Sequence, residues 1–137
     1  MLMGSARAFF WSTSAFRSVN DFGSFGPNET RALAVLSPIV DEMLGAHERG
    51  DYDAFSRLAT SEFRQKVTEA RFRRAFREIA PTLGTRMSTR FLSSSRIDGD
   101  PVLHYAAAYS EADEDVLIRV RFRNASTPPA IAWMWIE

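Results

Sequence analysis

The chain of 137 residues contains no cysteine. It can therefore form no disulfide, and it offers neither a thiol nucleophile nor a thiolate metal ligand. No apolar run approaches the roughly 20 residues that a membrane-spanning helix needs. The N-terminal stretch is interrupted by Ser12, Thr13 and Ser14, unlike the apolar centre of a signal peptide. We therefore expect no membrane partner and a cytoplasmic location.

Excess charge is also lacking, because 17 basic side chains balance 17 acidic ones. No overall field then attracts nucleic acid, which we do not expect as a partner. The two histidines, His47 and His104, are far apart in the chain and make no metal-binding motif. The chain has no glycine-rich phosphate loop, serine-centred elbow or paired-carboxylate spacing. We expect no metal, no cofactor and no catalytic residue.

Residues 1–27 form an N-terminal arm that is rich in phenylalanine, serine and glycine. Phe9 and Phe16 are seven positions apart, which is compatible with a short helix over residues 5–18. The arm has more aromatic side chains than a typical disordered segment. Two interpretations stay open: a tail that takes no part in the folded domain, or an arm that packs on it. Residues 28–137 are expected to form a single domain.

A long helix is predicted to begin after Asn28, which can cap it. Its apolar side chains recur at steps of three and four on one face, namely Leu33, Leu36, Val40, Met43 and His47. Pro38 predicts a kink, or a restart that Ser37 caps. Gly50 is suited to the left-handed end of this helix, and Asp51 can cap the next one at once. The sequence "RGDYDAF" therefore indicates a tight corner between two helices.

Two more helices and four strands are expected after this corner. Residues 61–67 and 69–84 have helical spacing, with Phe72, Phe76, Ile79 and Leu83 on one face of the second. From Thr85 the period changes to two, which predicts strands over residues 85–96, 102–111, 116–124 and 130–137. Asp98 and Gly99 mark a hairpin between the first two strands. Helices followed by an antiparallel meander predict an α+β fold, with the helices packed on one face of a curved four-stranded antiparallel sheet.

The order "GDYDAF", "SEFRQKVTEARFRRAFREI" and four strands resembles a family of small bacterial domains of unknown function. That family lies in the cystatin-like, nuclear transport factor two-like superfamily. The resemblance covers about residues 30–137 and implies a cone, in which helices wrap a bent sheet around an opening that can hold a ligand. Members of the superfamily include isomerases, dehydratases, small-molecule binders, accessory domains and dimerisation modules. The fold therefore does not determine the function.

The strands carry the residues that we expect to bind a small apolar or aromatic ligand: His104, Tyr105, Tyr109, Trp133 and Trp135. Enzymes of the superfamily use an acid or a base on the sheet, and no aspartate or glutamate of the predicted strands points into the cone. We therefore expect a non-catalytic ligand-binding, accessory or dimerisation module. The alternative is a small isomerase-like or dehydratase-like enzyme that uses His104 and Tyr105.

The last strand is apolar on both faces, with Ile131, Trp133 and Trp135 expected on one face and Ala132, Met134 and Ile136 on the other. One layer of helices can cover only one face of a sheet. We therefore expect a homodimer that forms partly through the sheet, with the N-terminal arm contributing cover.

Charges along the chain are segregated, because residues 64–96 are mostly basic and residues 98–115 carry only acidic charges. Arg119, Arg121 and Arg123 follow on one strand face. An anion or RNA surface is one interpretation. The favoured interpretation is that the basic and acidic segments pair within the fold.

Overall fold

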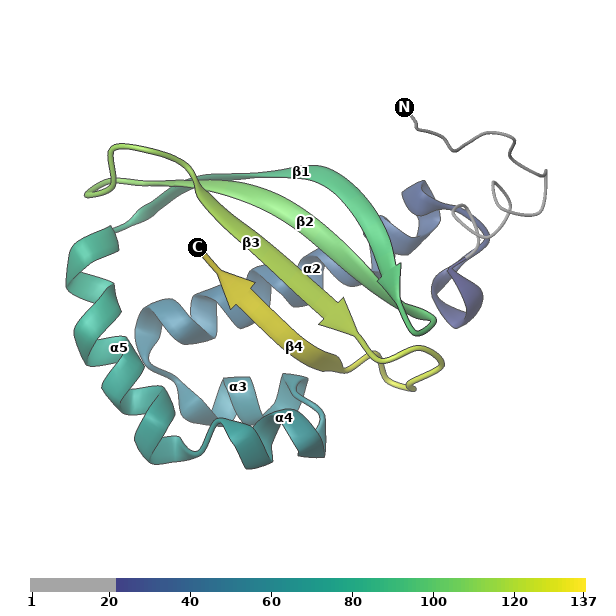
Figure 1. Cartoon of the computed structure of the whole chain (residues 1–137), viewed down its shortest axis with the longest axis horizontal. Coiled ribbons are helices and arrows are strands. Elements are labelled where there is room, and N and C mark those ends of the chain that lie inside the picture. The colour runs from purple at the N-terminus through teal and green to yellow at the C-terminus, as the bar shows by residue number, and fades with distance from the viewer. Residues whose placement is uncertain (1–21) are drawn as a thin grey trace.

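The structure is a computed structural model that describes residues 22–137. The helices come first: η1 (Gly23–Phe25), α2 (Glu29–Arg49), α3 (Tyr52–Leu58), α4 (Ser61–Lys66) and α5 (Glu69–Leu83). The strands follow as β1 (Arg86–Ile97), β2 (Asp100–Tyr109), β3 (Val116–Phe122) and β4 (Ile131–Ile136). They form one antiparallel sheet in the order β1-β2-β3-β4. Figure 1 shows α2 behind the bent sheet, with α3 and α4 beside the edge strand β4. The predicted α+β class is confirmed.

The predicted start of helix α2 is confirmed, but its predicted interruption is not. The Asn28 side chain accepts a hydrogen bond from the backbone N–H of Arg31 at 2.9 Å, as the capping prediction requires. Of the two outcomes predicted at Pro38, a kink or a restart, the restart is wrong, because α2 is one helix with Pro38 inside it. Ser37 caps nothing; its hydroxyl is 2.8 Å from the Tyr105 hydroxyl. The Ser37 hydroxyl, which the sequence predicted as a helix cap, is therefore bonded to Tyr105 of the sheet instead.

The corner between α2 and α3 has the predicted conformation. Gly50 is left-handed, with φ 67° and ψ 32°, and its N–H donates to the carbonyl oxygens of Ala46 and His47. The Asp51 carboxylate accepts from the backbone N–H of Ala54 at 3.1 Å, which starts α3. A residue with a β-carbon is strained at such a φ, so this position favours glycine.

We expect Gly50→Val to lower the free energy of unfolding by about 1–2 kcal/mol or more, because a left-handed conformation costs that much for a residue with a β-carbon. An added β-carbon would also lie 3.0 Å from the Phe76 ring. Chemical denaturation of the variant measures the loss. Gly45→Ala, inside the same helix, is the matched control and should raise stability by up to about 1 kcal/mol. Equal midpoints for Gly50→Val and the wild type would contradict the prediction.

Side chains on β2 and β3 alternate between the two faces of the sheet, as predicted for β3. Core side chains on the helix-facing side come from alternate positions of both strands: Leu103, Tyr105, Ala107, Tyr109, Val116, Ile118, Val120 and Phe122. His104 and Arg119 are cross-strand partners on the opposite face, which we call the outer face. The helices therefore cover one side of the sheet, and the outer face carries the charged positions of β3.

The predicted faces of β4 are wrong because of a β-bulge. Trp133 lies opposite Arg121, but Ile131 lies opposite Phe122, so Ala132 is an extra residue in the strand. Directly opposite residues share a face of the sheet. Ile131 is therefore buried on the helix-facing side. The partly buried Met134 and the 41% exposed Ile136 share that side, whereas Trp133 and Trp135 belong to the outer face.

The core extends into the last residues of the N-terminal arm. Phe22 and Phe25 are buried with relative exposures of 2% and 3%. The Phe25 ring meets Phe122 edge-on at 6.2 Å between centroids. These two residues therefore pack on the domain, whereas the helix predicted over residues 5–18 lies outside the described residues.

Candidate functional site

A cavity of about 80 Å³ lies between α2, α5 and the helix-facing side of the sheet. Apolar side chains make up most of its lining, including Leu44 of α2, Phe72, Phe76 and Ile79 of α5 and Ile136 of β4. Three polar side chains also line it: His47, Glu48 and Tyr109. An apolar chamber with a few polar groups is the usual form of a small-molecule site.

Helix α5 is anchored at its start by Phe72 and at its end by Leu83, and its middle turns border the cavity. Phe72, near its start, is buried and contacts Phe55 and His47, with ring centroids 5.1 Å and 5.0 Å apart. Ile79, two turns later, is 49% exposed. The predicted apolar face of α5 is therefore real, but its middle turns line an opening instead of filling the core.

Glu48 and Arg86 form an ion pair beside the cavity. The Nε of Arg86 donates to Oε2 of Glu48 at 2.6 Å, and the Tyr109 hydroxyl donates to the same oxygen at 3.0 Å. Arg86 also donates to Asp41 at 2.8 Å and to the Thr89 hydroxyl at 2.7 Å. Only 15% of the Arg86 side chain is exposed. The carboxylate and the guanidinium are thus fully engaged with each other and with their neighbours.

This arrangement could not be predicted from the alternation of β1, in which Met87 and Phe91 alternate with Arg86 and Arg90 and would share the opposite face. A register shift at Met87 breaks this alternation, and Met87 is 68% exposed. One signal in the sequence could have revealed Glu48. A carboxylate in the last turn of a helix opposes the helix dipole, so it needs a cation from elsewhere in the fold.

Burial and the negative charge of Glu48 raise the pKa of Tyr109 well above its ordinary value. The phenol therefore stays protonated at neutral pH, and its hydroxyl donates a hydrogen bond to Glu48. Toward a bound molecule, the tyrosine oxygen can therefore act only as a hydrogen-bond acceptor.

His47 lies at the same end of the cavity, with its Nδ1 3.0 Å from the carbonyl oxygen of Met43. Because a carbonyl oxygen can only accept, Nδ1 carries the proton. Burial lowers the pKa of His47, and the bond to Met43 and the charge of Glu48 only partly oppose this. The ring is therefore neutral at pH 7, and its Nε2 is an acceptor.

We expect acidification to destabilise the protein through His47. Its pKa is depressed in the folded chain, so its contribution to stability is complete above about pH 6.5, its ordinary pKa, and is lost as the pH falls through the folded value. Denaturation at pH 7 and pH 5 should show a smaller loss for His47→Phe than for the wild type. His104→Gln is the control and should keep the His47 part of the loss. Equal losses for His47→Phe and the wild type would contradict the prediction.

Of the predicted ligand-binding residues, Tyr109 lines this cavity and the others do not. Tyr105 faces the helices, but its hydroxyl is held by Ser37, and burial raises its pKa. His104 is on the outer face, where its Nε2 is 2.8 Å from the Ser95 hydroxyl. Its pKa is lowered by partial burial and by the charge of Arg119. The structure therefore does not bring His104 and Tyr105 together.

Trp133 and Trp135 line a second, more open hollow of about 390 Å³ beside β4. The Trp133 ring packs on Phe63 at 4.8 Å between centroids, with the Lys66 ammonium 5.7 Å from its centre. Arg119 lies 5.0 Å from the Trp135 ring. Cations of the same chain therefore already lie against both indole rings.

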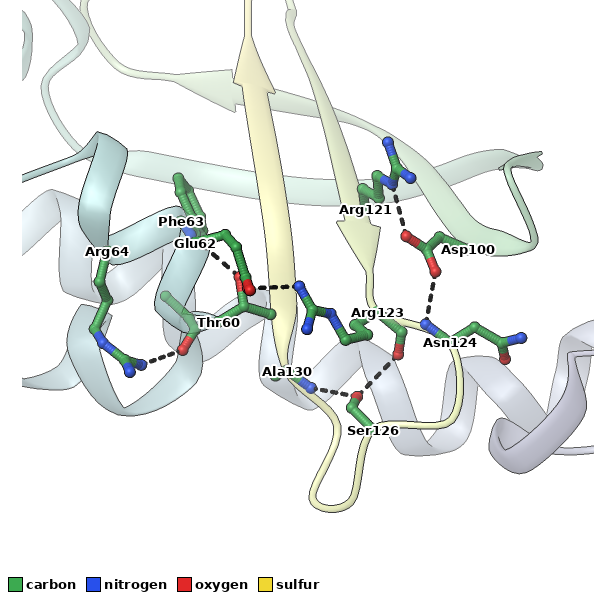
Figure 2. Close-up of polar contacts among 11 residues, drawn as sticks. Thr60, Glu62, Phe63, Arg64, Asp100, Arg121, Arg123, Asn124, Ser126 and Ala130 are labelled. Carbon is green, nitrogen blue, oxygen red and sulfur yellow. Dashed lines mark hydrogen bonds and ion pairs between the residues drawn. The ribbon is translucent and has the colours of Figure 1, made fainter.

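Ion pairs flank this hollow and account for part of the segregated charge. Figure 2 shows Arg123 bonded to Glu62, and Arg121 bonded to Asp100 at 2.9 Å. Arg90 pairs with Asp115 across the sheet at 3.0 Å. The predicted pairing of basic and acidic segments is confirmed for Arg90 with Asp115 and for Arg121 with Asp100. Within residues 22–137, no group of three or more potential ligands could hold a metal ion.

Comparisons with protein-family models, with curated proteins and with solved structures gave no significant match to this chain. The resemblance to the nuclear transport factor two-like superfamily therefore stays a prediction. In the part of the chain that the structure describes, no helix is long and apolar enough to cross a membrane.

Proposed function

We propose that this chain is a non-catalytic domain that binds a small, mostly apolar molecule in the cavity between α2, α5 and the sheet. The observation that carries the proposal is an apolar chamber with His47, Glu48 and Tyr109 among its lining. Sites for drug-sized molecules measure about 300–1,000 Å³. A cavity of about 80 Å³ therefore encloses a small molecule, or one end of a larger one.

The cone implied by the superfamily resemblance supports this proposal, because helices on a bent sheet with an internal opening are its expected form. We propose membership of that superfamily on the same ground. The cytoplasmic location stays a prediction from the sequence.

The enzyme alternative receives less support from the geometry. His104 and Tyr105 are adjacent on a strand, so they face opposite sides of the sheet. Glu48 is the carboxylate beside the cavity, and its oxygens already accept from Arg86 and Tyr109. A general base needs a free position within reach of a substrate proton. Binding without turnover is therefore the better proposal.

Titration of the full chain with toluene, followed by amide NMR, tests the binding proposal. We expect saturable shifts at residues that line the cavity, such as Leu44 and Tyr109. Ala75→Leu adds a side chain inside the cavity and should abolish these shifts. Ala70→Leu, at an exposed position of the same helix, is the matched control. No saturable binding, or binding that Ala75→Leu leaves unchanged, would overturn the proposal.

A second candidate function is self-association through the outer face and the free edge of β4. Beyond Ile131, which pairs with the segment at Ala59 and Thr60, no backbone bond to the outer edge of β4 is found among the described residues. Leu117 is 47% exposed on the outer face. An apolar edge strand is prone to pair with another chain, and we propose that a second copy of this chain covers it.

Sedimentation of the full chain tests this second proposal, and a monomer at all concentrations would refute it. Leu117→Asp should weaken the dimer, whereas Val35→Asp, on α2, is the control. A truncated chain should begin at Asp21, because a start at Pro27 would remove the buried Phe22 and Phe25. An unchanged mass and melting temperature of this truncated chain would show that the preceding residues add no cover.

A further inference from the structure

The hydrogen-bonding groups at the polar end of the cavity are almost all committed to protein partners. The Nδ1–H of His47 donates a hydrogen bond to the Met43 carbonyl oxygen, and the Tyr109 hydroxyl donates one to Glu48. Arg86 donates to Glu48, Asp41 and Thr89, and it is not part of the lining. The described residues therefore present no free donor here.

Two acceptors are left toward the cavity: the Tyr109 oxygen, which already takes part in the bond to Glu48, and Nε2 of His47. His47 lines the cavity, and its Nε2 makes no hydrogen bond to any residue that the structure describes. Since Nδ1 is turned to the backbone of its own helix, Nε2 on the other side of the ring is the nitrogen left for the cavity. Nε2 is not among the fully buried side-chain atoms that lack a partner, so it is accessible, and a ligand that covers it without offering a donor would leave it unsatisfied.

The lining restricts the chemistry of that ligand further. A carboxylate would bring a second negative charge close to Glu48 and would find no donor. A ketone or an ether would offer only acceptors to an acceptor. An ammonium group would leave water for a mostly apolar chamber whose one carboxylate is already paired with Arg86, and burying a charge in this way is costly.

From this arrangement we propose that the cavity selects a small neutral alcohol or phenol, whose hydroxyl donates a hydrogen bond to Nε2 of His47. Its apolar body lies against Phe72, Phe76 and Ile79, toward the open side of the cavity. This inference rests on the proposed ligand-binding function and names the class of ligand and the residue that selects it.

Phenol and toluene make a matched pair of probes, because a hydroxyl in one replaces a methyl group of similar size in the other. We expect the full chain to bind phenol about three- to tenfold more tightly, the usual net worth of one hydrogen bond. His47→Phe keeps a ring at this position and removes the acceptor, so it should remove the preference for phenol. His104→Phe, on the outer face, should keep it.

A second measurement needs no variant. Phenol should move the ¹⁵N resonance of His47 Nε2 in the wild-type chain, and toluene should not. Equal affinities for phenol and toluene, or an unmoved Nε2 resonance at saturation, would overturn the selection by His47 while the ligand-binding function stands. Failure of both probes to bind would overturn the binding function itself, and the inference with it.

Discussion

Replacing Phe55 by alanine should lower the free energy of unfolding by about 3–5 kcal/mol, the usual cost of removing a buried phenylalanine ring. Phe55 is fully buried, with 0% exposure. Its ring lies within 5.0–5.7 Å, between centroids, of four others: Phe63, Phe72, Tyr52 and His47. These rings come from α2, α3, α4 and α5, so the cavity left by alanine cannot close by the movement of a single helix.

Chemical denaturation followed by circular dichroism gives this loss directly. Since small domains have about 5–15 kcal/mol of stability in total, the variant should be largely unfolded at modest denaturant concentrations. Val35→Ala is the control, because Val35 is 46% exposed and such surface changes cost about 0.5 kcal/mol or less. A loss below about 1 kcal/mol for Phe55→Ala would mean that the ring cluster is not the centre of the helical layer.

The second large effect is expected for Glu48→Ala. This change leaves the guanidinium of Arg86, which is 15% exposed, with only Asp41 as a charged partner. Breaking a fully buried pair costs about 3–5 kcal/mol. Because Glu48 itself is 29% exposed, we expect a smaller loss of about 2 kcal/mol.

Asp41→Ala is the matched control, since it removes the other charged partner of the same arginine. Asp41 is 71% exposed, so its loss should cost less than about 1 kcal/mol. Similar losses for the two variants would show that burial does not distinguish the two ion pairs.

Glu48→Ala should also lower the pKa of Tyr109, because a charge that raises it is removed while burial remains. Ultraviolet absorbance of tyrosinate, followed as the pH is raised, measures this change in the pKa of Tyr109. In the wild type the raised pKa favours the protonated phenol in the folded state. Its contribution to stability is therefore complete below about pH 10, the ordinary tyrosine value, and is lost as the pH rises through the folded value.

Local chemistry explains why so much of the fold could be predicted from the sequence. Asn28, Gly50 and Asp51 act on backbone groups within four residues of themselves, so the sequence determines their roles. The Asp98–Gly99 hairpin is another such case, with both residues at positive φ. The alternation on β3 was equally direct, because every second side chain meets the same layer of helices.

The bulges were not predictable in this way. An extra residue at Ala132, or a shift at Met87, changes the face of the side chains beyond it. Whether the strand accepts that shift depends on long-range contacts, such as that of Arg86 with Glu48, 38 positions away in the chain. No short sequence pattern records such a contact.

One part of the site prediction conflicts with strand geometry that was visible in the sequence. It placed His104 and Tyr105 in one pocket, although neighbours on a strand point to opposite faces. Tyr109 lines the cavity because it is on the helix-facing side of β2. His47 was assigned to the apolar stripe of its helix, and Glu48 was missed because its partner lies on a distant strand.

The glycine at the helix corner has a consequence for how this cavity could change during evolution. The Phe76 ring, which lines the cavity, lies against the bare backbone of Gly50, where a β-carbon would come within 3.0–3.1 Å of it. Any larger residue at position 50 must displace that ring, which is part of the cavity wall. A residue outside the cavity lining therefore affects the shape of the proposed binding chamber. Relatives of this chain with a different residue at the corner should accept ligands of a different size.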